Sequence, residues 1–245
     1  PLRLRHASAP LAPRQADDHA VAERAGDHPA GDQPAGAPQR SRMLTPEQLA
    51  DLSTRTLAHY AERAEAFREG TQGHDVSQNI DALLSRIEGT PPYAILDFGC
   101  GPGRDLATFV RLGHHPVGIE ALPAFVDMAR GVKGAEVWQQ DFLALDLPAG
   151  RFDGIFANAS LFHVPSQELP RVLRELHASL APRGVLFSSN PHGNDEEGWN
   201  RGRYGAYHHP ATWQRDLGDA GFEELDLYYR PAGRPREQQP WLASV

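Results

Sequence analysis

Along residues 43–245, short apolar runs typical of strands alternate with segments in which hydrophobic residues have helical spacing, and this alternation predicts an α/β fold. Short apolar runs bounded by glycine or charged residues predict strands, and apolar residues at helical spacing predict helices. The strands are predicted at 93–98, 115–119, 135–138, 154–157 and 185–189, and the helices between them at 104–112, 123–130 and 165–180. Strands that alternate with helices in this way form a mostly parallel sheet with helices on both faces.

Both ends of this core carry additional elements. Ahead of the first strand, helices are predicted at 46–68 and 75–87, the first with Thr45 as its N-cap and Pro46 in its first turn. After the last of these strands, residues 190–207 are polar, aromatic and rich in glycine, which predicts a loop that faces the site. A helix at 210–220 and strands at 222–229 and 240–245 complete the predicted elements.

Residues 1–42 differ in composition from the rest of the chain. They are rich in Ala, Pro, Arg, Asp and Gly and contain no Phe, Trp or Tyr, so they are expected to be disordered. Met43 stands just before the first predicted helix, which suggests that it is the natural start and that 1–42 are upstream or vector-derived sequence. A genuine flexible tail is the alternative. We therefore expect a disordered or non-native tail at 1–42 and one domain at 43–245.

Composition and charge limit the classes of partner. The formal net charge of −8 argues against electrostatic binding of nucleic acid. We expect no signal peptide and no membrane span, because no apolar run approaches the ~20 residues that a span needs. The single cysteine, Cys100, rules out an internal disulfide and fits a reducing cytoplasm. The histidine pairs at 114–115 and 208–209 lack the spacing of a metal site, so we predict no metal. A monomer or homodimer is expected.

A glycine-rich turn follows the first predicted strand. In Ala94-Ile-Leu-Asp-Phe-Gly-Cys-Gly-Pro-Gly-Arg-Asp105, an acid at Asp97 precedes glycines at 99, 101 and 103, and a helix follows. A strand that runs into such a turn and then a helix is the nucleotide-binding corner of an open α/β sheet. The G-x-G-x-G spacing differs from the G-x-G-x-x-G of dinucleotide binders. A tight turn without a ligand is the alternative interpretation.

The sequence Asp-x-Gly-x-Gly-x-Gly resembles motif I of the class I S-adenosylmethionine (SAM)-dependent methyltransferases, whose turn wraps the methionine and ribose parts of SAM. The resemblance covers roughly 45–245 and is closest to the small-molecule group called methyltransferase type 11. It implies a Rossmann-like seven-stranded sheet in the order 3-2-1-4-5-7-6, with the last strand antiparallel, flanking helices and an N-terminal helical lid. It also implies SAM as methyl donor and S-adenosylhomocysteine (SAH) as product.

The same resemblance suggests which residues hold the cofactor. Glu120 ends the second predicted strand, where an acid accepts from ribose hydroxyls. Asp141 and Phe142 match the acid and apolar residue that hold the adenine amino group and ring. The expected cofactor-binding residues are Tyr60, Arg63, Asp97, Gly99, Cys100, Gly101, Gly103, Glu120, Ala121, Asp141, Phe142 and Asn158.

The acceptor side of the site is less defined by sequence. His163 follows the fourth predicted strand and has a pKa suited to general-base catalysis at neutral pH, although an equivalent histidine often only packs or caps in this family. Acceptor recognition is expected to involve His74, Asn190, Arg203, Tyr204 and Tyr207, together with residues of the last hairpin. Arginines near one pocket suit a carboxylate or phosphate, and solvated loop charges are the alternative.

The predicted function is methyl transfer from SAM to the O, N or S atom of a small molecule. No Asn-Pro-Pro-Tyr sequence follows the fourth predicted strand, which disfavours amino-methylation of DNA bases. A protein or RNA methyltransferase and a SAM-binding protein without turnover are the alternatives. A short-chain dehydrogenase is disfavoured by the glycine spacing and by the absence of a Tyr-x-x-x-Lys pair.

Overall fold

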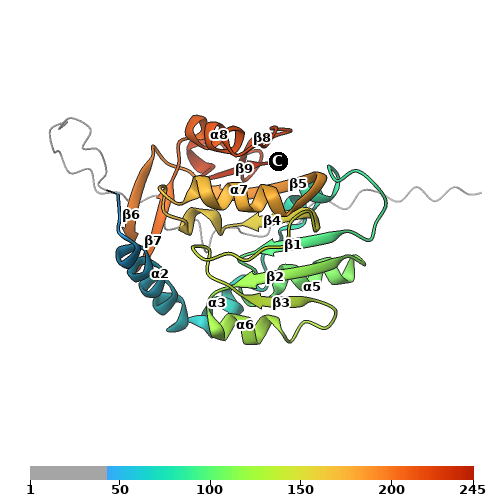
Figure 1. The fold of residues 1–245 in the computed structure, drawn as a ribbon, viewed down its shortest axis with the longest axis horizontal. Coiled ribbons are helices and arrows are strands. Elements are labelled where there is room, and N and C mark those ends of the chain that lie inside the picture. The colour runs from blue at the N-terminus through green and yellow to red at the C-terminus, as the bar shows by residue number, and fades with distance from the viewer. Residues whose placement is uncertain (1–42) are drawn as a thin grey trace, which may run out of the picture.

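The computed structural model describes residues 43–245 (Figure 1), so the predictions made for 1–42 lie outside the described residues. Its main feature is a seven-stranded sheet in the order β3-β2-β1-β4-β5-β9-β8. β1 to β5 are parallel, and β9 runs antiparallel to both β5 and β8. The strands are β1 Ala94–Phe98, β2 His115–Glu120, β3 Glu136–Gln139, β4 Phe152–Asn158, β5 Leu180–Pro191, β8 Leu227–Arg230 and β9 Trp241–Ser244. Apart from a separate hairpin, β6–β7, this confirms the predicted order 3-2-1-4-5-7-6.

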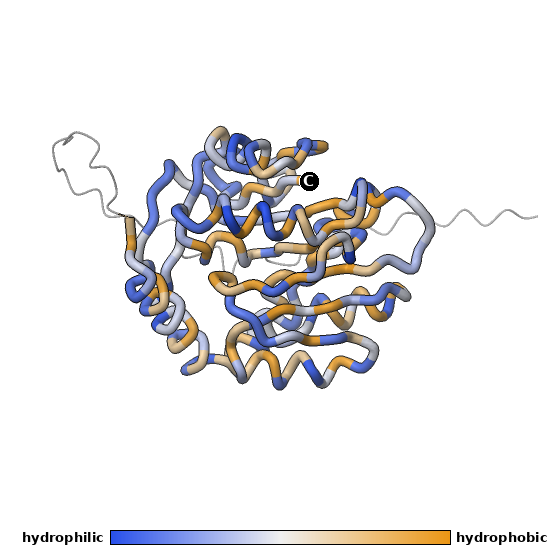
Figure 2. The backbone as a smooth tube through the Cα atoms, viewed as in Figure 1, coloured by the Kyte–Doolittle hydropathy of each residue, from blue (hydrophilic) through white to orange (hydrophobic). Residues whose placement is uncertain are grey.

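Helices cover both faces of the sheet because strand side chains alternate between the faces. Leu96 and Ile155 belong to a core shared with α7 and α8, whereas their neighbours Ile95 and Phe156 belong to a core shared with α4 and α5. Figure 2 shows hydrophobic positions along the central strands and mixed positions along the flanking helices. The helices are α4 Ser77–Leu84, α5 Arg104–Arg111, α6 Pro123–Ala129, α7 Leu169–Ser179 and α8 Pro210–Asp219, with short 3-10 helices η1 Leu161–His163 and η2 Arg236–Gln238.

The N-terminal helical region is two helices where one was predicted at 46–68. α2 spans Pro46–Ala61 and α3 spans Ala64–Thr71. The break falls at Arg63, whose φ of −130° departs from helical geometry, and sequence spacing alone did not indicate it. Thr45 caps α2 as expected, in a reciprocal capping box with Gln48. Within residues 43–245, no helix is both long enough and apolar enough to cross a bilayer.

The segment predicted as a loop at 190–207 contains an antiparallel hairpin. β6 spans Glu196–Asn200 and β7 spans Arg203–Tyr207. The two residues between them, Arg201 and Gly202, both have positive φ (52° and 89°), as in the two-residue turns that match strand twist. The hairpin lies beside α2 at one edge of the molecule (Figure 1), so it belongs to the wall of the site instead of forming a flexible loop.

Candidate active site

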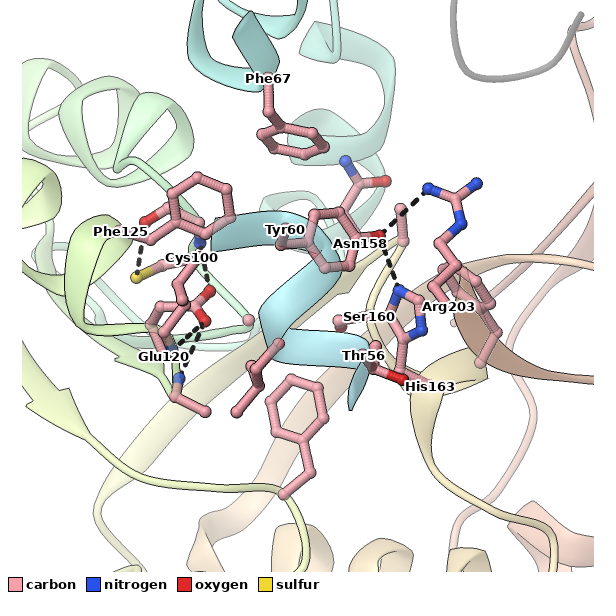
Figure 3. A pocket seen from close by; sticks show the side chains of 18 of the residues that line it. Thr56, Tyr60, Phe67, Cys100, Glu120, Phe125, Asn158, Ser160, His163 and Arg203 are labelled. Carbon is pink, nitrogen blue, oxygen red and sulfur yellow. Dashed lines mark hydrogen bonds between the residues drawn. The ribbon is translucent and has the colours of Figure 1, made fainter. Parts of the chain in front are cut away.

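A pocket lies over the carboxyl ends of β1, β2, β4 and β5 and is covered by α2 and α3 (Figure 3). Ligands of open parallel sheets bind at this edge, where the strand order reverses. Most of the residues predicted for the site line this one pocket. They are Tyr60, His74, Gly99, Cys100, Gly101, Glu120, Ala121, Asp141, Phe142, Asn158, His163, Arg203 and Tyr204.

The glycine turn leaves its backbone open to the pocket. Gly99, Gly101 and Gly103 have φ values of 79°, 52° and 93°, which only glycine adopts at little cost. A Cβ on Gly99 would lie 2.7 Å from the Cβ of Ser160 and 3.0 Å from the Phe142 ring. Gly103 instead faces α6, where a Cβ would lie 3.0 Å from Ala129, and it does not line the pocket. A side chain at Gly99 would therefore clash with residues of the pocket, and a side chain at Gly103 would clash with α6.

Asp97 lies buried beneath this turn and does not line the pocket itself. Its side chain is 3% exposed, and its Oδ2 atom has no hydrogen-bond partner within residues 43–245. Burial, followed by the nearby Asp105 carboxylate, raises the pKa of Asp97 well above its ordinary value. A buried carboxyl oxygen without a hydrogen-bond partner is costly, so its retention favours a role toward a ligand.

Glu120 at the end of β2 holds the turn in place. Its Oε2 accepts from the Gly101 amide at 3.0 Å, and its Oε1 accepts from the amides of Ala121 and Leu122 at 2.9 Å each. Burial raises the pKa of Glu120, while these three amides oppose the shift. A carboxylate has about four acceptor sites, so one further hydrogen bond is available toward the pocket.

Asp141 and Phe142 follow β3 and line the same side of the pocket. Asp141 accepts from the Ser53 hydroxyl on α2 and, through Oδ1, from the Leu143 amide at 2.8 Å. Phe142 stacks on Phe98 with ring centroids 4.2 Å apart. Sequence reasoning missed Ser53, because nothing in its local spacing indicates that α2 reaches across to the loop after β3.

Tyr60, His163 and Arg203 form a chain of hydrogen bonds across the pocket (Figure 3). Arg203 Nη1 donates to the Tyr60 hydroxyl at 3.2 Å, and Tyr60 Oη lies 2.9 Å from His163 Nε2. His163 Nδ1 lies 2.7 Å from the Tyr204 carbonyl oxygen. Since a carbonyl only accepts, Nδ1 carries the proton, and Nε2 accepts from Tyr60.

Burial keeps Tyr60 and His163 uncharged in this chain of hydrogen bonds, so Arg203 carries its only charge. Burial lowers the pKa of His163 to about 4, with Arg203 acting in the same direction, so the imidazole is uncharged at neutral pH. Burial also raises the pKa of Tyr60 despite the opposing effect of Arg203. The Cys100 thiol on the opposite wall is likewise kept protonated, because burial raises its pKa. Arg203 is therefore the charged member of this chain.

The hairpin β6–β7 positions Arg203 and Tyr204 by packing on α2. The Tyr204 amide donates to Thr56 Oγ1 at 3.1 Å, and the Arg55 guanidinium lies 3.9 Å from the Trp199 ring centroid. A Cβ on Gly202 would lie 2.5 Å from His59 Nδ1, so the hairpin turn touches α2 directly. Thr56 is a second site residue that sequence reasoning missed, since its partner is far away in the chain.

Several predicted residues lie elsewhere. Arg63 is exposed at the break between α2 and α3. Asn190 is buried and accepts from the Phe162 amide at 3.2 Å, and the Tyr207 hydroxyl accepts from Asn200 at 3.2 Å. None of these three lines the pocket. Asn158 does, and it accepts from Asn79 Nδ2 at 2.9 Å. Within the described part of the chain, no three His, Cys, Asp or Glu side chains gather to hold a metal, and the prediction of no metal stays a prediction.

The chain is similar to several known methyltransferases. Residues 95–184 match a family model described as a methyltransferase domain. The trans-aconitate 2-methyltransferase of Paracidovorax citrulli (strain AAC00-1) is 34% identical over 142 residues, which are 56% of this chain and 53% of that protein. That of Azoarcus sp. (strain BH72) is 33% identical over 118 residues, 46% of this chain and 45% of that protein. The chain thus spans about half the length of these curated relatives.

A solved structure supports the same fold over a larger share of the chain. The 1,6-didemethyltoxoflavin-N1-methyltransferase of Burkholderia thailandensis, solved with 1,6-didemethyltoxoflavin and SAH bound, gives a TM-score of 0.67 at 23% identity. The match covers 89% of this chain and 96% of that one. The finer assignment to the type 11 group stays a prediction. The domain match, the relatives and the sheet order agree on a methyltransferase domain at residues 95–184, within the fold of a SAM-dependent methyltransferase.

Proposed function

We propose that the protein transfers a methyl group from SAM to the O, N or S atom of a small molecule. The observation that carries the proposal is the set of acids at the tips of three neighbouring strands around one glycine turn. Asp97 belongs to β1, Glu120 ends β2 and Asp141 follows β3. SAM carries a positive sulfur and an ammonium group, and such an acidic surface suits a cationic nucleoside.

The residues present fit this cofactor. Asp97 does not line the pocket, but its buried Oδ2 lies beneath the glycine turn without a donor within residues 43–245, and it suits an ammonium or hydroxyl group that reaches past the turn. Glu120 retains one acceptor site for a ribose hydroxyl, and Phe142 offers a ring face for adenine. The close approach of Gly99 to Ser160 and Phe142 leaves no room for a side chain there. When bound, SAM supplies an electrophilic methyl group activated by its positive sulfur.

The protein's part in the reaction is to align the reactants and exclude water. α2 and α3 cover the pocket, and Phe67 and Phe125 add apolar walls, with ring centroids 5.2 Å apart. Alignment of two bound reactants supplies about 7 kcal/mol or more. His163 Nε2 already accepts from Tyr60, so a proton from an acceptor reaches it through the Tyr60 hydroxyl. With a pKa of about 4, His163 is a weak base and suits acceptors that need little deprotonation.

A small acceptor is favoured by how closely the site is covered. α2 and the hairpin β6–β7 contact each other across the pocket edge, through Thr56, Tyr204 and Gly202. A protein or RNA substrate would need an open groove or a basic face there. The relatives named for trans-aconitate and the neighbour named for 1,6-didemethyltoxoflavin also act on small molecules by name. A cytoplasmic location and a monomeric or homodimeric state stay predictions.

Two measurements test the proposal. Calorimetric titration should give saturable SAM and SAH binding in the micromolar range. A metabolite extract supplied with methyl-labelled SAM should then yield a labelled small product. Absence of both SAM and SAH binding would rule the proposal out. SAH binding without transfer to any component of the extract would favour a SAM-binding protein without turnover.

A further inference from the structure

Besides the Arg104–Asp105 ion pair next to the glycine turn, the charged residues that line the pocket lie on two different sides. Glu120 and Asp141 stand at the tips of β2 and β3, at one end of the sheet. Arg203 on β7 and Arg230 at the end of β8 line the other side. Figure 3 shows Glu120 and Arg203 on opposite sides of Tyr60. The acidic side suits a cationic donor, so the basic side is left for the second reactant.

Arg203 has an unusual environment for a half-buried arginine. Its Nη1 atom donates to the neutral Tyr60 hydroxyl, and its guanidinium carbon lies 5.9 Å from the Tyr60 ring centroid. Within residues 43–245, no carboxylate lies at ion-pair distance from it. Arg171, by contrast, pairs with both Glu168 and Glu175. A half-buried guanidinium with only a neutral partner can still donate in the paired geometry that matches a carboxylate.

The fold fixes Arg203 in this position. Arg203 is the first residue of β7, directly after the tight turn at Arg201 and Gly202. The next residue is tied to α2 through the Tyr204 amide and Thr56, and to η1 through the Tyr204 carbonyl and His163. A preorganised guanidinium loses less conformational entropy when it binds an anion. The arrangement is that of a binding group, not of a solvated surface charge.

We propose that the methyl acceptor is a small organic anion and that the Arg203 guanidinium binds its carboxylate. This rests on the proposed methyltransferase function, because it assigns the acceptor end of the same pocket. Phe162 and Trp241 line this end too, which suits an apolar or aromatic skeleton behind the carboxylate. Tyr60 lies between Arg203 and His163, so an acceptor held by Arg203 lies next to the neutral Tyr60–His163 pair.

The choice of Arg203 over His163 as the anion-binding group has a measurable consequence. His163 is neutral at physiological pH, whereas arginine stays charged throughout this range. Anion binding through Arg203 is therefore constant between about pH 6 and 9. Binding through a protonated histidine would weaken as the pH rises through this range.

The test uses SAH-saturated protein and defined probes. Benzoate, phenylacetate and trans-cinnamate are titrated by calorimetry beside their primary amides and beside phenyl phosphate. The carboxylates should bind about tenfold or more tightly than the amides, since a hydrogen bond to a charged group is stronger than one to a neutral group. Arg203→Gln should lose about tenfold or more of the carboxylate affinity, and Arg203→Lys less. The control Arg201→Gln, in the exposed turn of the same hairpin, should bind like the parent.

Each outcome decides between the two proposals. If the parent protein does not bind SAH, the methyltransferase proposal itself is ruled out. If SAH binds, the anion inference is overturned by any of three results: amides bind as well as carboxylates, no carboxylate binds, or Arg203→Gln leaves carboxylate affinity unchanged. Tighter binding of phenyl phosphate than of benzoate overturns the carboxylate assignment. SAH affinity in Arg203→Gln should stay within about twofold of the parent, which shows that the variant is folded.

Discussion

The two sides of the pocket are built in different ways. On the acidic side, Asp97, Glu120 and Asp141 each stand at or just after the strand that positions them. On the basic side, Tyr60 comes from α2, His163 from η1 and Arg203 from β7. Tyr60 is hydrogen-bonded to both of the others, although it lies 103 residues from His163 and 143 residues from Arg203 in the sequence. The first side follows from local order in the chain. The second exists only when α2 and the hairpin meet over the folded sheet.

The largest effect is expected for Gly99→Ala on the acidic side. The new Cβ would approach Ser160 at 2.7 Å, in addition to the cost of a φ of 79°, about 1–2 kcal/mol. We expect SAH affinity to fall about 100-fold or more. Gly113→Ala is the matched control, because Gly113 has a similar φ of 85° and no neighbour within 4 Å. Chemical unfolding should show that Gly113→Ala loses stability, and calorimetry should show that it keeps the parental SAH affinity. Equal SAH affinity in both variants would contradict the explanation that a side chain at Gly99 blocks the pocket.

Asp97→Asn should separate binding from stability. Burial raises the pKa of Asp97 in the folded protein above the ~3.9 of an unfolded chain. Between these two values the folded state binds more protons than the unfolded chain, so the free energy of unfolding falls as the pH rises. Removing the ionisable group should therefore leave the ligand-free protein as stable or more stable above this range. SAH binding should weaken by about 1–3 kcal/mol.

Denaturant unfolding at several pH values and calorimetry with SAH measure these two effects. Asp127→Asn is the control, since Asp127 is exposed on α6 and distant from the pocket lining. It should change neither quantity. If Asp97→Asn and Glu120→Gln both kept the parental SAH affinity, the cofactor would not bind at the acidic side.

The parts of the acidic side that sequence could predict are those set by neighbouring residues. Strand tips, the glycine turn and the acids at or just after the ends of β2 and β3 are all encoded within a few positions of one another. The alternation of elements predicts a mostly parallel sheet, whereas the strand order is implied by the resemblance to methyltransferases. Sequence spacing does not show which way a residue of the turn faces, so it predicts Gly103 as a cofactor contact. In the structure, Gly103 lies close against α6 instead.

The basic side was predicted only in part for a physical reason. Arg203 and Tyr204 were expected to face the site, but from a loop, because the turn at Arg201 and Gly202 was not identified as the centre of a hairpin. The roles of Ser53 and Thr56 depend on contacts with residues 88 and 148 positions away. No local pattern in one sequence encodes which helix face meets which strand.

Tyr60→Phe tests the basic side with a moderate expected effect. The variant removes the hydroxyl that accepts from Arg203 and donates to His163, and leaves the ring contact with Phe67 intact. We expect turnover to fall about tenfold, less than the roughly 10²–10⁴-fold that a general acid or base contributes, because His163 stays held by the Tyr204 carbonyl. SAH affinity should change less than threefold. Tyr93→Phe, whose hydroxyl donates to Gly89 outside the pocket, is the control, and an equal loss in both would show a general effect of stability.

The smallest effect is expected where the hairpin meets α2. Thr56→Val keeps the shape of the side chain and removes the acceptor of the Tyr204 amide, at a cost of about 1 kcal/mol. Hydrogen exchange of the Tyr204 amide should become faster, while the core strands stay protected. The exposed Thr54→Val on the same helix should leave this amide unchanged. Unaltered exchange in Thr56→Val would mean that the hairpin is held by other contacts.

A crystal structure of the SAH complex would show directly whether the cofactor occupies the acidic side and leaves Arg203 to the acceptor. We expect ribose hydroxyls at Glu120, adenine beside Asp141 and Phe142, and the sulfur facing the space beside Tyr60 and Arg203. An adenosyl group bound against Arg203 and Trp241, with the glycine turn at 99–103 untouched, would contradict this expectation.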